Sequence, residues 1–193
     1  MRVAFVSVPR FACAVEMLRQ PQLARRPLIV GDAEVPKRVL DCSRDAGKQH
    51  VQPGMTIRSA LIECPDAVIV PPDPVLYRGL WEAVLDAFAD IAPEVEDQDL
   101  GCAYLNVDGL LPHYRDESAL CERIVEAVRG ASGLAASVGI AAGKLPAYAA
   151  ASRAAGKIYA IDRGEEALFL APIPVDLLPF DEPAIERLHL LAE

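Results

Sequence analysis

Short apolar runs alternate with helix-forming segments along the whole chain. Runs rich in Val, Ile and Phe predict β-strands over residues 2–8, 28–31, 38–42, 67–70, 94–98, 102–107, 135–141 and 157–161. Capping residues and apolar spacing predict helices over residues 11–20, 57–64, 146–155 and 165–170, a helical turn that ends near 49, and longer helices that begin at 74 and near 116. The pattern therefore predicts a mixed protein of helices and strands.

The long helix that begins at Pro74 has the clearest apolar pattern. Proline is favoured at the first position of a helix, where its missing N–H costs nothing. The apolar side chains that follow it recur every three or four residues: Leu76, Leu80, Val84, Phe88 and Ile91. This stripe predicts that one face of the helix packs on a hydrophobic core.

The order of the elements predicts the fold class. One strand comes first, and residues 11–73, with shorter strands and helices, separate it from the remaining strands. The later elements alternate between helix and strand in the order of a ferredoxin-like core. We therefore expect an α+β fold whose core is discontinuous in sequence and carries a small inserted lobe.

Composition adds limits on the compartment and on cofactors. No apolar run reaches the roughly 18 residues that suggest a membrane helix, so no membrane contact is expected. The cysteines form no C-x-x-C pair and are odd in number: Cys13, Cys42, Cys64, Cys102 and Cys121. This usage favours a reducing, cytoplasmic compartment, without disulfides, zinc or another metal or cofactor.

The formal net charge of −9 bears on nucleic-acid binding. The acidic excess lies in residues 74–193, whereas acidic and basic residues balance over 11–73. Negative charge opposes contact with a phosphate backbone, so DNA binding is expected to be weak or absent, although a solvated surface explains the same charge. The basic side chains of the inserted lobe are a possible contact for DNA or a protein partner, or a solvated face: Arg25, Arg26, Lys37, Arg38 and Arg44.

Several short motifs also occur in a fixed order along the chain. They are Phe11 with Val15-Glu16, Pro53-Gly-Met55, Cys64-Pro-Asp66, Val70-Pro-Pro-Asp73, Gly133-Leu-Ala-Ala-Ser-Val-Gly-Ile-Ala141 and Leu170-Ala-Pro-Ile-Pro-Val175. In this order they resemble the Y-family (translesion, UmuC/DinB-like) DNA polymerases over nearly the whole chain. The resemblance implies a polymerase palm formed by residues 1–10 and 74–171.

The same resemblance implies two further parts. Residues 11–73 correspond to the fingers lobe, and residues 172–193 to the start of a truncated helical thumb, with the family's little-finger domain absent. Where the family has a glycine-rich hairpin that meets DNA phosphate, this chain has Asp181 and Glu182. Their like charge is expected to repel a phosphate.

The positions that correspond to the family's catalytic carboxylates hold other residue types. The resemblance places them on Ser7, Gly101 and Cys102. Because Mg²⁺ prefers hard oxygen ligands, these residues imply a lost metal site. Asp99 is expected to point to the same side of its strand as Gly101, but solvated acids at a strand end are the ordinary explanation for it.

The nucleotide-binding positions of the family are changed as well. The steric-gate aromatic corresponds to Ala12, the triphosphate-binding Tyr and Arg correspond to Arg44 and Gly47, and the triphosphate-binding Lys corresponds to Ala155. The resemblance therefore implies no nucleotide site of the family type.

Taken with the resemblance, these residues lead to a functional expectation. The chain is expected not to be an enzyme and to act as an accessory or scaffold factor in DNA repair or translesion synthesis. It resembles inactive homologues in bacterial mutagenic-repair assemblies, which implies an active translesion polymerase and a sliding clamp as partners. Two alternatives are a module that binds primer-template or damaged DNA without extending it, and an active nucleotidyltransferase with a rearranged metal site.

Overall fold

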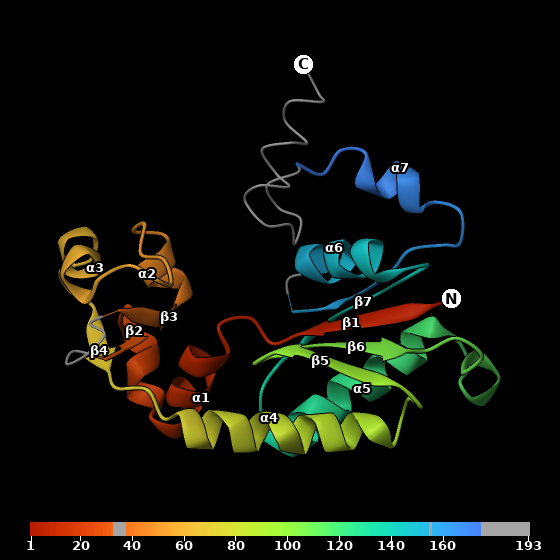
Figure 1. Ribbon diagram of the computed structural model, residues 1–193, viewed down its shortest axis with the longest axis horizontal. Coiled ribbons are helices and arrows are strands. Elements are labelled where there is room, and N and C mark those ends of the chain that lie inside the picture. Colours follow the sequence, from red (N-terminus) through yellow and green to blue (C-terminus); the bar gives the residue numbers. More distant parts are fainter. Residues whose placement is uncertain (33–37, 155, 175–193) are drawn as a thin grey trace.

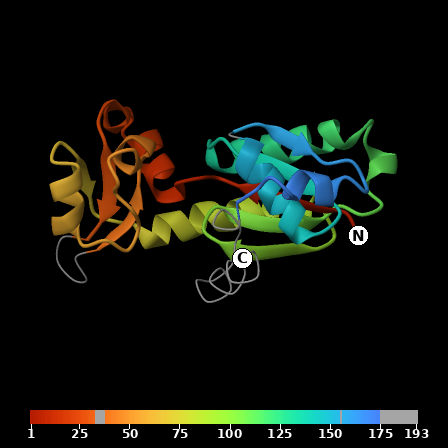
Figure 2. The ribbon, with the colours of Figure 1, turned by 90° about the horizontal axis from the view of Figure 1, so that it is seen from above.

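The computed structural model describes residues 1–32, 38–154 and 156–174. In these residues the chain forms two lobes side by side, each built on its own β-sheet (Figure 1). The larger lobe contains the five-stranded sheet, and the smaller lobe contains the three-stranded sheet. The long helix α4 (Pro74–Ala89) runs from the smaller lobe beneath the larger one (Figures 1 and 2).

The sheet of the larger lobe has the first strand of the chain at its centre. The strand order is β5-β6-β1-β7-β8, with bounds β1 (Val3–Ser7), β5 (Val95–Asp99), β6 (Cys102–Asn106), β7 (Ser137–Ala141) and β8 (Ile158–Ala160). Strand β1 is antiparallel to both of its neighbours, and β8 pairs with β7 in parallel. Since β1 and β6 are about 100 positions apart, this pairing brings Ser7 opposite Cys102.

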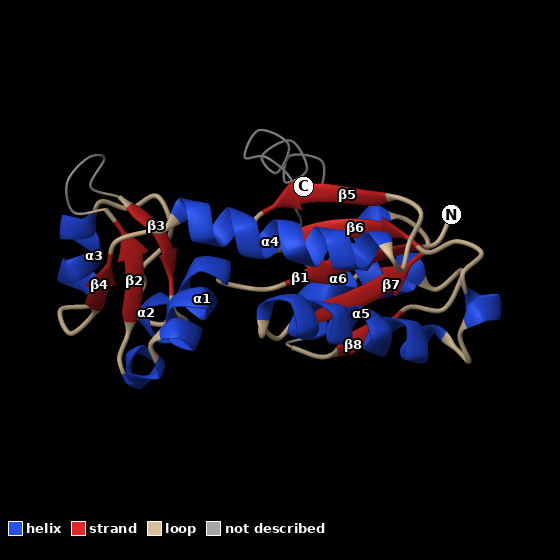
Figure 3. Ribbon diagram, turned by 90° about the horizontal axis from the view of Figure 1, so that it is seen from below, coloured by secondary structure: helices blue, strands red, loops and turns tan. Residues whose placement is uncertain are grey.

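Helices cover both faces of the larger sheet. Helices α4 and α5 (Glu117–Ser132) lie on one face, and α6 (Lys144–Ala154) lies on the other (Figures 1 and 3). The side chains of β1 alternate between these layers, because Ala4 and Val6 belong to the α4–α5 core and Phe5 packs with the α6 side. The larger lobe is completed by the short helices η2 (Leu111–His113) and α7 (Glu166–Leu170).

The smaller lobe combines one antiparallel and one parallel strand pair. Its strands are β2 (Leu28–Gly31), β3 (Val39–Cys42) and β4 (Val68–Val70), in the order β3-β2-β4. Its helices are α1 (Phe11–Arg19), η1 (Pro21–Arg25), α2 (Arg44–Gly47) and α3 (Ile57–Glu63). Ser43 and Thr56 cap α2 and α3, since each side-chain oxygen accepts a hydrogen bond from a backbone N–H of the following helix.

Side chains of α1 and α4 connect the two lobes. The rings of Phe11 and Trp81 meet edge to face with centroids 5.7 Å apart. The buried hydroxyl of Tyr77 donates a hydrogen bond of 2.8 Å to the carboxylate of Glu16. These contacts join α1 of the smaller lobe to α4, which packs on the larger sheet, and so fix the two lobes to each other.

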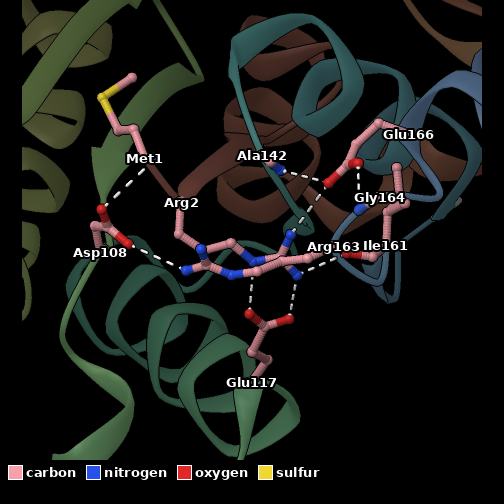
Figure 4. A network of polar contacts seen from close by, with 9 residues as sticks. All are labelled: Met1, Arg2, Asp108, Glu117, Ala142, Ile161, Arg163, Gly164 and Glu166. Atoms are coloured by element: carbon pink, nitrogen blue, oxygen red, sulfur yellow. Dashed lines mark hydrogen bonds and ion pairs between the residues drawn. The ribbon is translucent and has the colours of Figure 1, made fainter.

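A buried arginine holds together the other end of the larger lobe (Figure 4). The guanidinium of Arg2 donates two hydrogen bonds, of 2.6 and 2.5 Å, to the carboxylate of Glu117 and a third to the carbonyl of Ile161. Glu166 lies 3.6 Å away on the opposite side. The pairing with Glu117 raises the pKa of Arg2, although burial acts against it. The cluster therefore connects β1 to α5 and α7.

The structure confirms the predicted α+β class, with a core whose first strand is separated from the others by an inserted lobe. The residue boundaries of palm, fingers and thumb stay a prediction. Residues 175–193, with Asp181 and Glu182, lie outside the described residues, as do Lys37 and Ala155. No helix in the described ranges is long and apolar enough to cross a membrane.

Candidate functional site

A cleft of about 250 Å³ lies where the two lobes meet. We call it the interlobe cleft. Its lining comes from the end of β1 and the start of α1, from β3 of the smaller lobe, and from the β5–β6 turn: Ser7, Val8, Pro9, Arg10, Phe11, Ala12, Leu40, Asp41, Asp99, Leu100 and Cys102. The fold thus brings together Ser7 and Cys102, which the sequence singled out, with Arg10 and Asp41, which it did not.

Ser7 and Cys102 face each other across two paired strands. They are register partners of β1 and β6, and the thiol of Cys102 points to the hydroxyl of Ser7 with 4.0 Å between Sγ and Oγ. Burial raises the pKa of the Cys102 thiol above its usual value, while the Ser7 hydroxyl acts in the opposite direction. The pair is therefore a neutral hydroxyl beside a neutral thiol at physiological pH.

Gly101, beside Cys102, occupies a position where a side chain does not fit. Its φ of 84° is in the left-handed region, which glycine adopts most readily. A Cβ at this position would lie 2.7 Å from the carbonyl oxygen of Val8 and 3.0 Å from the Cβ of Phe11. The backbone is fixed there, because the N–H of Val8 donates a 2.7 Å hydrogen bond to the carbonyl of Gly101. Residue 101 is thus a glycine in a place where the packing leaves no room for a carboxylate side chain.

Asp41 and Asp99 are the carboxylates that line the cleft. Asp41 accepts backbone hydrogen bonds from Cys13, at 3.0 Å, and from Cys42, at 2.8 Å. Burial raises the pKa of Asp41, and the two hydrogen bonds and the charge of Arg10 oppose that rise. Asp99 is exposed, and one of its oxygens accepts a hydrogen bond from the N–H of Leu100. Each carboxylate is therefore already bonded to its local backbone.

The family resemblance implies divalent cations at Ser7, Gly101 and Cys102, and the residues present do not fit them. A serine hydroxyl and a protonated thiol are poor ligands for Mg²⁺, and residue 101 has no room for a side chain. In the described part of the chain, no group of three or more His, Cys, Asp and Glu residues is arranged to hold a metal ion.

The expected nucleotide-binding positions are only partly brought to the cleft. Ala12 lines it from the first turn of α1, but Arg44 is exposed on α2. Gly47, at the end of α2, lies beside Arg10: a Cβ at Gly47 would be 3.3 Å from Nη2 of that arginine. Sequence reasoning missed Arg10. Its place between Ser7 and Phe11, two positions that the family resemblance singled out, was the signal that could have indicated it.

The expected basic contact cluster is spread over the smaller lobe. Arg25 ends η1, whereas Arg26 donates a hydrogen bond to the carbonyl of Asp66 and Arg38 donates one to the carbonyl of Gly54. Two of these side chains thus stabilise loops through backbone carbonyls. A role in DNA or partner contact stays a prediction for all of them.

Solved structures with this architecture are DinB-type polymerases. The chain aligns over its whole length with the crystal structure of DinB from Sulfolobus solfataricus, with a TM-score of 0.88 and 25% identity, and covers 57% of that chain. A structure described as a Dbh ternary complex with substrates partially disordered aligns over 99% of this chain, with a TM-score of 0.85 and 26% identity, and 57% of it is covered. The fold thus matches that of the palm and fingers in structures of Y-family DNA polymerases.

Sequence comparison gives the family. Residues 6–152 match the impB/mucB/samB family model. DNA polymerase IV of Dehalococcoides mccartyi (strain 195) is 32% identical over 92% of this chain and 46% of its own length. DNA polymerase IV of Methanoculleus marisnigri is 34% identical over 92% of this chain and 50% of its own length. The chain belongs to the impB/mucB/samB family of Y-family, DinB/UmuC-like DNA polymerases, and it spans about half the length of these relatives.

The comparisons correct one expectation. The prediction that the chain is not an enzyme is wrong, because relatives that are 32–34% identical are named DNA polymerase IV and the solved neighbours are DinB polymerases, which points to an active enzyme. The prediction relied on the residue types at three family positions. Ser7, Gly101 and Cys102 do not fit a metal ion, so other groups of the cleft are the candidates to act on a substrate.

Proposed function

We propose that the surface around the interlobe cleft binds primer-template DNA and that this cytoplasmic chain takes part in translesion DNA synthesis. The observation that carries the proposal is the two-lobed frame itself, which follows the Dbh ternary complex over 99% of this chain. The cleft lies between the end of the central strand β1 and the smaller lobe, so a nucleic acid that entered it would contact both sheets.

The names of the relatives support a DNA-directed DNA polymerase as the enzyme class. Asp99 and Asp41 are the acidic groups that the cleft offers for such chemistry. Of the two, Asp99 is the better candidate to meet a substrate, because it is exposed and lies opposite Cys102 in the strand register. Asp41 is half-buried and both of its oxygens accept backbone hydrogen bonds.

Fluorescence anisotropy of a labelled primer-template tests the DNA-binding part of the proposal. We expect binding at ~50 mM salt that weakens strongly at ~200 mM, because each phosphate contact releases a counterion. Extension of the same primer with deoxynucleoside triphosphates and Mg²⁺ or Mn²⁺ tests the enzyme class. No binding at either salt concentration would contradict the proposal.

A second candidate function is docking on an active translesion polymerase and a sliding clamp. Strand β5 favours it, because this edge strand of the larger sheet presents the exposed acidic side chains Glu96, Asp97 and Asp99, of which Glu96 pairs with Lys144 and Asp97 with Arg78. An acidic edge is better suited to a basic protein surface than to a phosphate backbone. Size-exclusion chromatography with a purified translesion polymerase and clamp tests this role, and elution as separate species at micromolar concentration would contradict it.

A further inference from the structure

Arg10 has an unusual conformation at the edge of the interlobe cleft. It precedes α1 with φ 56° and ψ 52°, in the left-handed region that residues with a Cβ seldom adopt. The conformation directs the side chain across the cleft to the smaller lobe, where Nη2 lies 3.3 Å from the position of a Cβ on Gly47. Strained backbone of this kind persists where the surrounding structure favours it, often at binding sites.

Gly47 provides the space for this side chain. It is the last residue of α2 and is not among the residues with positive φ, so its backbone does not require glycine. Glycine is also unfavourable in a helix compared with alanine. A Cβ at residue 47 would come close to the guanidinium, which would have to shift by a few tenths of an ångström.

The guanidinium of Arg10 keeps its hydrogen-bond donors available. Among the described residues, it forms no hydrogen bond or ion pair with another side chain or with the backbone. The charged groups that line the cleft with it are Asp41 and Asp99. The charge of Arg10 favours the ionised form of Asp41, whose two oxygens are already bonded to backbone N–H groups. A guanidinium with five free donors matches the geometry of phosphate oxygens.

We propose that Arg10 binds a phosphate group in the interlobe cleft without a divalent cation. This inference rests on the proposed function and names the group that contacts its ligand. Ser7 and Cys102 are neutral and do not fit Mg²⁺, so the positive charge that a phosphate needs comes from the protein. The phosphate belongs either to the DNA backbone or to a nucleoside triphosphate, and the two sources are separated below.

The first experiment measures binding of labelled primer-template in EDTA over a series of salt concentrations. Arg10→Gln is compared with Arg123→Gln, which removes an exposed arginine on α5 that lies outside the cleft. If the source is DNA, the slope of log K against log salt is expected to fall in magnitude by about one for Arg10→Gln and to stay unchanged for Arg123→Gln. Thermal unfolding confirms that both variants are folded.

The second experiment titrates deoxyadenosine triphosphate in EDTA by calorimetry. Binding that Arg10→Gln reduces at least tenfold identifies a nucleotide as the source. Gly47→Ala is a further variant that leaves Arg10 in place. Its Cβ would move the guanidinium by a few tenths of an ångström, so we expect a smaller loss of binding of the same ligand than for Arg10→Gln.

The outcomes separate this inference from the proposed function. Suppose that the wild-type chain binds DNA, but that neither Arg10→Gln nor Gly47→Ala changes the salt slope or nucleotide binding. The proposed role of Arg10 is then wrong, and the proposal that the chain binds DNA stands. If EDTA abolishes all binding that Mg²⁺ supports, the metal-free character is wrong. If the wild-type chain binds neither DNA nor nucleotide, the proposed function fails as well.

Discussion

The hydroxyl of Tyr77 donates a 2.8 Å hydrogen bond to the carboxylate of Glu16, and both side chains are buried where α1 meets α4. The two residues are 61 positions apart in the sequence. Arg19 completes the arrangement, because its guanidinium lies 3.1 Å from the same carboxylate. The bond therefore joins the first helix of the smaller lobe to the helix that runs beneath the larger one.

Tyr77→Phe tests the contribution of this bond to stability. The substitution removes a buried hydrogen bond to a charged group, while Arg19 still donates to the same carboxylate oxygen, so we expect a loss of about 1–2 kcal/mol in the free energy of unfolding. Tyr159→Phe is the control, since Tyr159 is 44% exposed and should change stability by less than about 0.5 kcal/mol. Urea denaturation measures both, and an equal midpoint for the two variants would contradict the assignment.

The ion pair between Arg2 and Glu117 gives a second prediction. Arg2 is 3% exposed, and removing one partner of a buried pair typically costs about 3–5 kcal/mol. We expect Glu117→Gln to destabilise the chain by less than this range, because Glu117 is itself 20% exposed and Glu166 remains near Arg2. Arg115→Gln breaks the exposed pair with Asp116 and is expected to change stability far less than Glu117→Gln, because solvent screens an exposed pair. Thermal unfolding in which the two variants behave alike would argue against a structural role for the cluster.

Gly101 and Gly79 form a matched pair of glycine positions. Gly101→Ala places a Cβ 2.7 Å from the Val8 carbonyl on a backbone with positive φ, so we expect a loss of more than about 2 kcal/mol. Gly79→Ala adds a Cβ on α4 with nothing within 4 Å and is expected to stabilise by about 0.5–1 kcal/mol. Chemical denaturation measures both changes. A stable, folded Gly101→Asp variant would contradict the packing argument and reopen this position for a carboxylate.

Thiol labelling tests the environment of Cys102. Four of the five cysteines are buried and Cys102 is partly exposed, so one thiol should react with iodoacetamide in the folded chain and five after unfolding. Because burial raises the pKa of Cys102, the reactive thiolate is scarce at pH 7 and labelling should accelerate only as the pH rises beyond the usual thiol range. The same sign applies to stability: the neutral thiol is favoured in the fold, and its contribution is lost as the pH rises through the folded pKa. Rapid labelling at pH 7 that Cys102→Ala removes would contradict the raised pKa.

Primer extension tests which acid in the cleft takes part in DNA synthesis. We expect Asp99→Asn to reduce extension by the wild-type chain at least tenfold, because Asp99 is the exposed carboxylate beside Cys102. Glu94→Gln is the control, since Glu94 is also exposed and acidic but lies outside the cleft at the other end of β5. DNA-binding measurements on both variants separate lost chemistry from lost affinity. Full extension by Asp99→Asn would assign the reaction to other groups.

Local sequence signals predicted most of the helices and strands. Helix α4 begins at Pro74, as expected. The side chains of Asp73, Ser43 and Thr56 cap α4, α2 and α3, and such caps can be recognised in a sequence because they depend on residues within one turn. The apolar stripe of α4 lies against the core through Val84 and Phe88, as its spacing predicted. The prediction that the chain is not an enzyme failed for a different reason. It inferred the absence of activity from the residue types at three positions, without knowing which other side chains line the cleft.

The sequence by itself determined the α+β class, the order of the elements, and the residue types Ser7, Gly101 and Cys102 in place of carboxylates. Only the tertiary structure decided that Asp41 from the smaller lobe lines the same cleft as Asp99, and that Arg10 lies against Gly47. The physical reason is that secondary structure depends on neighbours within a few residues. The cleft instead depends on strand pairing and lobe packing between segments that are tens of residues apart, and no local pattern specifies those contacts.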